Sequence, residues 1–133
     1  MLDNRISESS FEICDTSLSH VRLKNNKNYP WIILIPRVEK NITEIFQLND
    51  NQQHELIREI SHFSRCMQQY FHADKINVGA LGNIVSQLHI HIIARFENDL
   101  SWPHSVWQAN VPEKIYMADE ADKLIQQLRV SFK

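Results

Sequence analysis

Apolar side chains recur at helical spacing in two segments of the chain. Between residues 50 and 71 they repeat about every 3.6 residues, and Asn49 or Asp50 can cap the first turn. The same spacing returns in residues 118–129. The pattern therefore predicts a long amphipathic helix in the middle of the chain and a shorter one near its end.

Four shorter segments have the pattern of β-strands. Some alternate apolar and polar residues, and one, closed by Pro36, is apolar throughout, as is typical of a buried strand. Together with the two helices they predict an α+β fold. The strands are expected at residues 18–24, 31–35, 75–80 and 87–94.

Length and charge fit a single domain, residues 1–133, and argue against several classes of protein. The 133 residues are 43% hydrophobic with a formal net charge of −2, unlike a basic nucleic-acid-binding module. We find neither a signal peptide nor an apolar run of the ~18 residues that a membrane span needs. Cys14 and Cys66 form no CxxC motif, which favours a reducing compartment. We therefore expect a cytoplasmic protein with no nucleic-acid or membrane partner.

Charge is unevenly distributed along the first forty residues. Residues 21–40 carry five Lys or Arg side chains against one Glu, and this basic segment can attract an anionic small molecule. Ordinary solvated surface charge is the alternative interpretation.

The chain has two glycines, Gly79 and Gly82, which lie three residues apart. Glycine is used where the backbone takes a positive φ or closely approaches another group. Both precede the strand expected at residues 87–94, so they mark a loop of unusual backbone path beside that strand. A tight structural turn alone would also explain them.

That strand carries the residues best suited to chemistry. Side chains alternate along a strand, so Gln87, His89 and His91 project from one face. Two imidazoles and an amide displayed beside a glycine loop are suited to binding an anion. The core-facing residues are expected to be the alternate ones, Leu88, Ile90 and Ile92.

Three interpretations of the two histidines are open. They can be polar residues on a solvated face, or they can contribute two ligands to zinc or iron, with a third from His20, His72 or His104. They can also act on a phosphate while the backbone amides of residues 79–83 receive its negative charge. No carboxylate stands at the spacing of a metal motif, so no metal ligand is assigned.

The histidine segment resembles the signature of the histidine triad (HIT) family of nucleotide hydrolases and transferases. That signature is His-x-His-x-His-x-x with apolar x, preceded by Gly-Gln. Here Gln-Leu-His-Ile-His-Ile-Ile, residues 87–93, takes the place of the triad, and Gly82-Asn83 takes the place of Gly-Gln. His89 therefore matches the middle histidine.

The resemblance extends along most of the chain. Asn77 matches an upstream Asn of the family, and Asn25 lies in a hairpin similar to the family's nucleoside-binding hairpin, where Asn or Asp holds the ribose hydroxyls. The match covers a core of residues 18–96. The tail comprises residues 97–133, and its segment 99–107 resembles a tryptophan-rich end seen in a bacterial branch of HIT-like proteins. Trp102 and Trp107 in this segment can stack on a base or lie at a dimer edge.

The resemblance implies a fold and an activity. The fold would be a HIT-like antiparallel sheet of about five strands with a long helix and a C-terminal helix, in a homodimer. The activity would be hydrolysis or transfer at the α-phosphate of a nucleotide, such as diadenosine polyphosphate, another dinucleoside polyphosphate or an adenylate phosphoramidate. No cofactor would be required, although a divalent cation such as Mg²⁺ can assist a polyphosphate substrate.

The resemblance also implies a role for each matching residue. His89 would be the nucleophile that forms a nucleotidyl-histidine, with its other ring nitrogen donating to an oxygen. His91 and Gln87 would complete the catalytic set by binding or orienting the phosphate oxygens. The implied substrate-binding residues are Asn25, Asn77, Gly82 and Asn83.

Three positions depart from the family's pattern. Gln87 stands at the first triad position, Ile84 stands where Ser or Thr often contacts the phosphate, and Trp31 stands where many members carry a fourth histidine. These departures leave a non-catalytic nucleotide-binding module as an alternative function, and a His-x-His metal enzyme as a further one.

Overall fold

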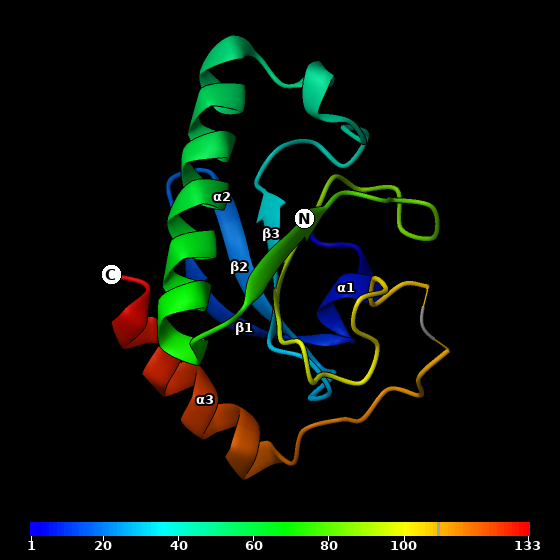
Figure 1. Ribbon diagram of the computed structural model, residues 1–133. Helices are drawn as coiled ribbons and strands as arrows, with labels where there is room; N and C mark the ends of the chain where they lie inside the picture. Colours follow the sequence, from blue (N-terminus) through cyan, green and yellow to red (C-terminus); the bar gives the residue numbers. More distant parts are fainter. Residues whose placement is uncertain (109) are drawn as a thin grey trace.

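A computed structural model describes residues 1–108 and 110–133. Within them, five antiparallel strands form one sheet in the order β1-β2-β3-β5-β4 (Figure 1). The α+β class and the five-stranded sheet are thus confirmed. The elements, in chain order, are α1 Asn4–Ser7, β1 Ser10–Asp15, β2 Ser19–Lys24, β3 Trp31–Pro36, the 3₁₀ turn η1 Ile45–Gln47, α2 Asp50–Phe71, β4 Lys75–Gly79, β5 Ile90–Arg95 and α3 Ala118–Ser131.

The long helix α2 has the bounds that the sequence predicts. The Asn49 side chain accepts a hydrogen bond from the Gln52 backbone N–H, and the Gln52 side chain accepts one from the Asn49 N–H, which forms a capping box. At the other end His72 takes the left-handed conformation, with φ 55°, and ends the helix. None of the helices in the described part of the chain is long and apolar enough to cross a membrane.

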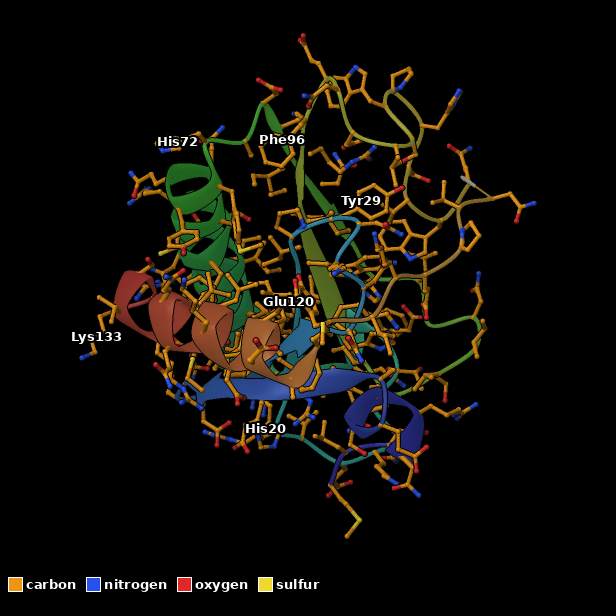
Figure 2. All side chains as sticks on the ribbon, turned by 90° about the horizontal axis from the view of Figure 1, so that it is seen from below. His20, Tyr29, His72, Phe96, Glu120 and Lys133 are labelled. Atoms are coloured by element: carbon orange, nitrogen blue, oxygen red, sulfur yellow. The ribbon has the colours of Figure 1, made fainter. Side chains whose placement is uncertain are left out.

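Helices α2 and α3 lie on one side of the strands (Figures 1 and 2). The main core fills this side: Ile90 and Ile92 of β5 belong to the same buried cluster as Met67 of α2 and Leu128 of α3. Leu88 belongs to it as well, so the prediction that the alternate residues of the histidine segment face the core is confirmed.

A second, smaller core covers the opposite face of the sheet. There Ile6 of α1 packs with Tyr29, Trp31, Ile33 and other buried side chains. β3 is consequently buried along its whole length, which explains its continuous apolar sequence. The short helix α1 lies on this face, away from α2 and α3 (Figure 2).

The structure differs from the sequence-based expectation in three elements. β1 was not predicted, because a shift in register between Glu12 and Cys14 breaks the alternation of its side chains. α1 has four residues, too few to show helical periodicity. β5 begins at Ile90 and not at residue 87, so His89 lies just before the strand.

Candidate active site

A pocket of about 560 Å³ opens on the face of the sheet opposite α2. Its floor is formed by Trp31 and Ile33 of β3 together with His89 and His91. Residues 81–85 form one side. The N-terminal segment and Trp107 also line it. The size falls within the range of ~300–1,000 Å³ that is typical of small-molecule sites.

The backbone holds His89 in one orientation and selects one tautomer of the neutral ring. Its Nδ1 lies 2.6 Å from the carbonyl oxygen of Gln87, and the side chain is 8% exposed. A carbonyl oxygen can only accept a hydrogen bond, so Nδ1 carries the proton and Nε2 is unprotonated in the neutral ring. His89 therefore presents a nucleophilic nitrogen in a pocket.

His91 is held in the opposite tautomer by Trp31. The indole Nε1–H of Trp31 donates to Nδ1 of His91 over 2.9 Å, so the proton of the neutral ring is on Nε2. Burial, together with smaller electrostatic effects of His89 and Lys24, lowers the pKa of His91 to about 3. His91 is therefore a neutral hydrogen-bond donor over the physiological pH range.

The two rings are neighbours in the pocket. Their centroids are 4.8 Å apart, and the planes are inclined by 72°. An unprotonated nitrogen on His89 and an N–H on His91 are thus presented side by side. This pairing suits a nucleophile beside a donor for the oxygens of the group under attack.

Each glycine has its own structural reason. Gly82 has a φ of +70°, which other residues adopt at a cost. A Cβ on Gly79 would lie 2.9 Å from the Trp107 ring, so this glycine makes room for the indole. Gly82 and Asn83 line the same pocket as His89. No backbone N–H from residue 82 to 86 donates to a backbone carbonyl of a described residue, which leaves these amides free for a ligand.

The two tryptophans of the tail occupy different environments. Trp107 lines the pocket and makes edge-on contacts with Trp31 and His91, at centroid distances of 5.9 and 5.2 Å. Trp102 is instead beside Arg95, whose guanidinium lies 5.8 Å from its ring centroid. Of the two tail tryptophans, Trp107 is therefore the one that can contact a ligand in this pocket.

The Gln87 side chain does not lie in the pocket, contrary to expectation. Its Oε1 accepts the backbone N–H of Asp3 at 2.8 Å, and its Nε2 donates to the carbonyl of Met1 at 2.9 Å. The amide is 7% exposed and holds the N-terminal segment. Only the backbone carbonyl of Gln87 contacts His89.

Asn25 and Asn77 also differ from the sequence-based assignment, because neither lines the pocket. Oδ1 of Asn25 accepts the backbone N–H of Tyr116 and ties the β2–β3 hairpin to the tail. Oδ1 of Asn77 accepts from Arg95, a side chain that is 1% exposed. Both amides hold distant parts of the chain together.

Sequence reasoning overlooked part of the pocket wall. Arg5, Ile6 and Ser9 come from the N-terminal segment, which showed no recognisable motif. Lys24 belongs to the basic segment that the charge distribution singled out, and its Nζ lies 5.9 Å from the Trp31 ring centroid. The Nζ is also 3.8 Å from a carboxylate oxygen of Glu113, which lines the pocket as well.

The metal interpretation finds no third ligand in the described residues. They contain no group of three His, Cys, Asp or Glu side chains able to hold a metal ion. His20 is hydrogen-bonded to Asp15, and His72 lies at the C-terminal end of α2. Nδ1 of His91 is occupied by the Trp31 indole.

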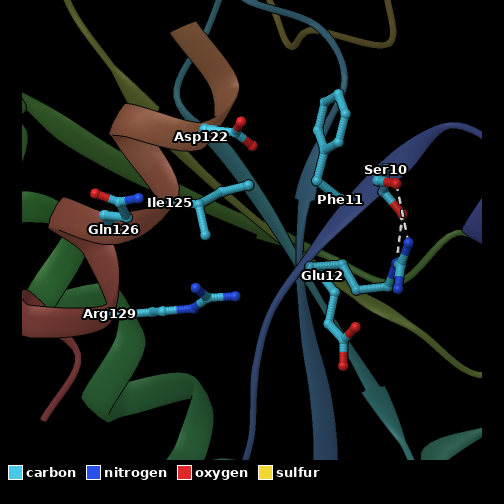
Figure 3. A pocket seen from close by; sticks show the side chains of 8 residues that line it. Ser10, Phe11, Glu12, Asp122, Ile125, Gln126 and Arg129 are labelled. Carbon is cyan, nitrogen blue, oxygen red and sulfur yellow. Dashed lines mark hydrogen bonds between the residues drawn. The ribbon is translucent and has the colours of Figure 1, made fainter. Parts of the chain in front are cut away.

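A second pocket, of about 360 Å³, lies between β1 and α3 (Figure 3). Its two arginines already have protein partners. Arg22 donates to Ser10, and Arg129 donates to the carbonyl of Ile13. This pocket shares no residue with the one that contains His89.

The fold and the pair of histidines in the pocket are those of a known protein family. The family model of the HIT domain matches residues 7–98, and the chain therefore belongs to the HIT family. No curated protein matches the chain.

Solved structures of three bacterial histidine triad proteins are similar over nearly their whole length. The protein from Bradyrhizobium japonicum is 39% identical, with a TM-score of 0.94, and the match covers 100% of this chain and 98% of that one. The protein from Marinobacter aquaeolei is 36% identical, with a TM-score of 0.95 and coverage of 99% and 95%. The protein from Sinorhizobium meliloti is 34% identical, with a TM-score of 0.93 and coverage of 98% and 96%.

Proposed function

We propose that the protein is a nucleotide hydrolase or transferase that acts at the α-phosphate through a covalent nucleotidyl-histidine on His89. One observation carries the proposal. Nδ1 of His89 faces a carbonyl oxygen, so that the lone pair on Nε2 is available in a pocket with free backbone amides. Membership of the HIT family supports the same activity.

In the first step Nε2 of His89 attacks the α-phosphorus. A P–N bond forms, the bond from phosphorus to the leaving group breaks, and the leaving group takes up a proton from solvent water. The ring is positively charged while it bears the phosphorus, and the Gln87 carbonyl stabilises this charge at Nδ1–H. Water or another acceptor then attacks the phosphorus and gives up its proton to solvent. The P–N bond breaks, its electron pair returns to Nε2, and the neutral imidazole is restored.

Negative charge on the phosphate oxygens needs donors that are already oriented. The Nε2–H of His91 and the backbone amides near Gly82 and Asn83 are available for this role. Removing one such donor typically costs about 3 kcal/mol in the barrier. Because Ile84 has no hydroxyl, position 84 can offer only its backbone N–H to the phosphate.

The proposed substrates are dinucleoside polyphosphates and adenylate conjugates such as phosphoramidates. Both place a leaving group on the α-phosphorus of a nucleotide, which is the atom that His89 would attack. Mg²⁺ can accompany a polyphosphate by neutralising its charge. We further propose that Trp107, at the pocket wall, contacts the base or the leaving group.

A homodimer is also proposed, with the β4 edges of two sheets adjoining. β1 and β4 are the outer strands of the sheet, and no residue of β4 is buried, whereas β1 has two buried positions. β4 therefore has the freer edge, and a second copy can extend the sheet there.

A non-catalytic nucleotide-binding module is the second candidate function. It is favoured by Ile84, which is 84% exposed in the loop where the family often has a hydroxyl, and by the engagement of Asn25 with Tyr116. Such a module would bind nucleotide without releasing product.

Product release from adenosine 5′-phosphoramidate and from diadenosine tetraphosphate, followed by chromatography, separates the two functions. Turnover by the unmodified protein, its loss in His89→Ala and its retention in His54→Ala would support the enzyme. His54 is an exposed histidine on α2 and serves as the matched control. Full turnover in His89→Ala would contradict the proposed mechanism.

A further inference from the structure

We propose that Arg5 binds the phosphate of the nucleotide and that Gln87 is the positioning residue that holds Arg5 at the pocket. The inference rests on the proposed function, because the ligand is the same nucleotide. It assigns new roles to the N-terminal segment, residues 1–9, and to the residue at the first triad position.

Gln87 uses both atoms of its amide to hold this segment. Oε1 accepts from the backbone N–H of Asp3, and Nε2 donates to the backbone carbonyl of Met1. These partners are 84 and 86 residues away in the sequence. A buried amide whose donor and acceptor are both satisfied fixes the position of the backbone that it contacts. Gln87 therefore sets where the segment lies.

The segment held in this way forms a wall of the pocket. Ile6 is buried in the same cluster as Trp31 and Ile33, which are floor residues of the pocket. Arg5 and Ser9, on either side of Ile6, line the pocket as well. The packing of Ile6 and the hydrogen bonds of Gln87 therefore both hold the N-terminal segment in place.

The Arg5 guanidinium is oriented before any ligand binds. Its Nε and one terminal nitrogen donate to the two carboxylate oxygens of Asp3, and the other terminal nitrogen donates to the carbonyl of Ile84 at 3.0 Å. Arginine has five N–H donors, so two remain for a ligand. Ile84 belongs to the loop beside His89, and Arg5 is thus directed to the part of the pocket where the phosphate is proposed to bind.

A cation in this position compensates for the departures from the family pattern. Ile84 has no hydroxyl, and the Asn83 side chain is one methylene shorter than the family's glutamine. Guanidinium binds phosphate oxygens through short, charge-assisted hydrogen bonds. The other cation that lines the pocket, Lys24, lies beside Glu113 and the Trp31 ring. Arg5 is itself paired with Asp3 at 2.9 Å, but it also donates to the carbonyl of Ile84 in the loop. Arg5 is therefore the cation that lies next to the loop.

Nucleotide binding measured by calorimetry tests the inference. The probes are the 5′-monophosphates of adenosine, guanosine, cytidine and uridine, each compared with its own nucleoside. In Arg5→Gln we expect monophosphate affinity to fall about tenfold or more, because a charge-assisted contact is lost, while nucleoside affinity stays unchanged. Arg5→Lys should restore part of the loss. Arg58→Gln, an exposed position on α2, is the matched control and should bind like the unmodified protein.

Gln87→Leu tests the positioning role. This variant should weaken monophosphate binding by a factor similar to that of Arg5→Gln. The double variant should be no weaker than the weaker single one, because both changes remove the same contact. Fully additive losses would overturn the positioning role.

The remaining outcomes separate the two proposals. Unchanged monophosphate affinity in Arg5→Gln, or an equal loss for monophosphate and nucleoside, would overturn the inference and leave the proposed function standing. An unmodified protein that binds none of the monophosphates would overturn both.

Discussion

At the residue scale, the two imidazoles of the site differ because of what each Nδ1 faces. His89 faces a backbone carbonyl and His91 faces an indole N–H, so their available nitrogens have opposite character. The same residue type therefore supplies an unprotonated nitrogen in one case and a donor in the other. This division of roles depends on Trp31.

Replacing Trp31 with Phe should allow His91 to adopt both neutral tautomers. In the unmodified protein, nitrogen NMR should show His91 neutral with its proton on Nε2, since burial lowers its pKa to about 3. In Trp31→Phe the His91 ring no longer receives the indole N–H at Nδ1, so both neutral tautomers should appear. Trp107→Phe keeps a ring against His91 and should leave its tautomer unchanged. Identical His91 signals in Trp31→Phe would show that the indole has no such role.

The sequence was sufficient to predict that the two histidines lie beside the glycine loop, but not the places of the other residues assigned to the site. His89, His91, Gly82 and Asn83 lie within ten consecutive positions, so strand alternation and the glycine loop predict that they meet. The other assigned residues have partners that no local pattern reveals. Asn25 pairs with Tyr116, 91 residues away, and the partners of Gln87 lie near the opposite end of the chain.

At the scale of elements, β5 is joined to the tail by a buried ion pair. Arg95, the last residue of β5, donates to both carboxylate oxygens of Asp99 over 2.8 and 3.0 Å. Arg95 also donates to Ser101 and to the carbonyl of His104. These bonds fix the path of the segment that leads to Trp107.

Asp99→Asn should destabilise the fold by about 3–5 kcal/mol, because it leaves the buried Arg95 charge without its partner. Burial alone would raise the pKa of Asp99, but the hydrogen bonds from Arg95 and from backbone N–H groups prevail and lower it to about 2. The folded-state pKa is below the unfolded value of 3.8, so the stabilisation is present above about pH 4 and lost as pH falls toward 2.

Urea unfolding at a series of pH values measures this effect. The free energy of unfolding should differ strongly between the unmodified protein and Asp99→Asn near about pH 5. This difference should shrink toward about pH 2. Asp119→Asn, at an exposed position in α3, should change stability little. A pH-independent difference would contradict the role of the ionised pair.

The predicted helices agree with the structure because their apolar periodicity is long and uninterrupted. α2 was predicted with its exact bounds and α3 to within two residues of its end. β1 was missed for the opposite reason, since the register shift at Glu12 and Cys14 disturbs a six-residue pattern. Strands are thus predicted less well where a bulge interrupts a short segment.

At the scale of the whole molecule, the sheet order leaves β4 as an outer strand with exposed apolar side chains close to the site. Val78 of β4 is 49% exposed, and Leu81, which lines the pocket, is also exposed. A second copy adjoining β4 would cover this surface next to the site.

Val78→Asp should therefore shift the proposed dimer toward monomer, because it places a charge on the surface that the second copy covers. Sedimentation velocity over a range of concentrations measures the change. Val130→Asp alters an exposed valine on α3 and should leave the dimer intact. An unmodified protein that sediments as a monomer at every concentration would contradict the dimer.

The central claim is that Nε2 of His89 forms a bond to phosphorus, and a single-turnover experiment tests it most directly. The protein is mixed with adenosine 5′-phosphoramidate in less than stoichiometric amount, quenched in alkali because the P–N bond is labile to acid, and analysed by mass spectrometry of its peptides. We predict a transient adduct of one nucleotide on the peptide that contains His89, absent in His89→Ala. Product formation at full rate with no adduct at any time, or an adduct on another residue, would contradict the claim.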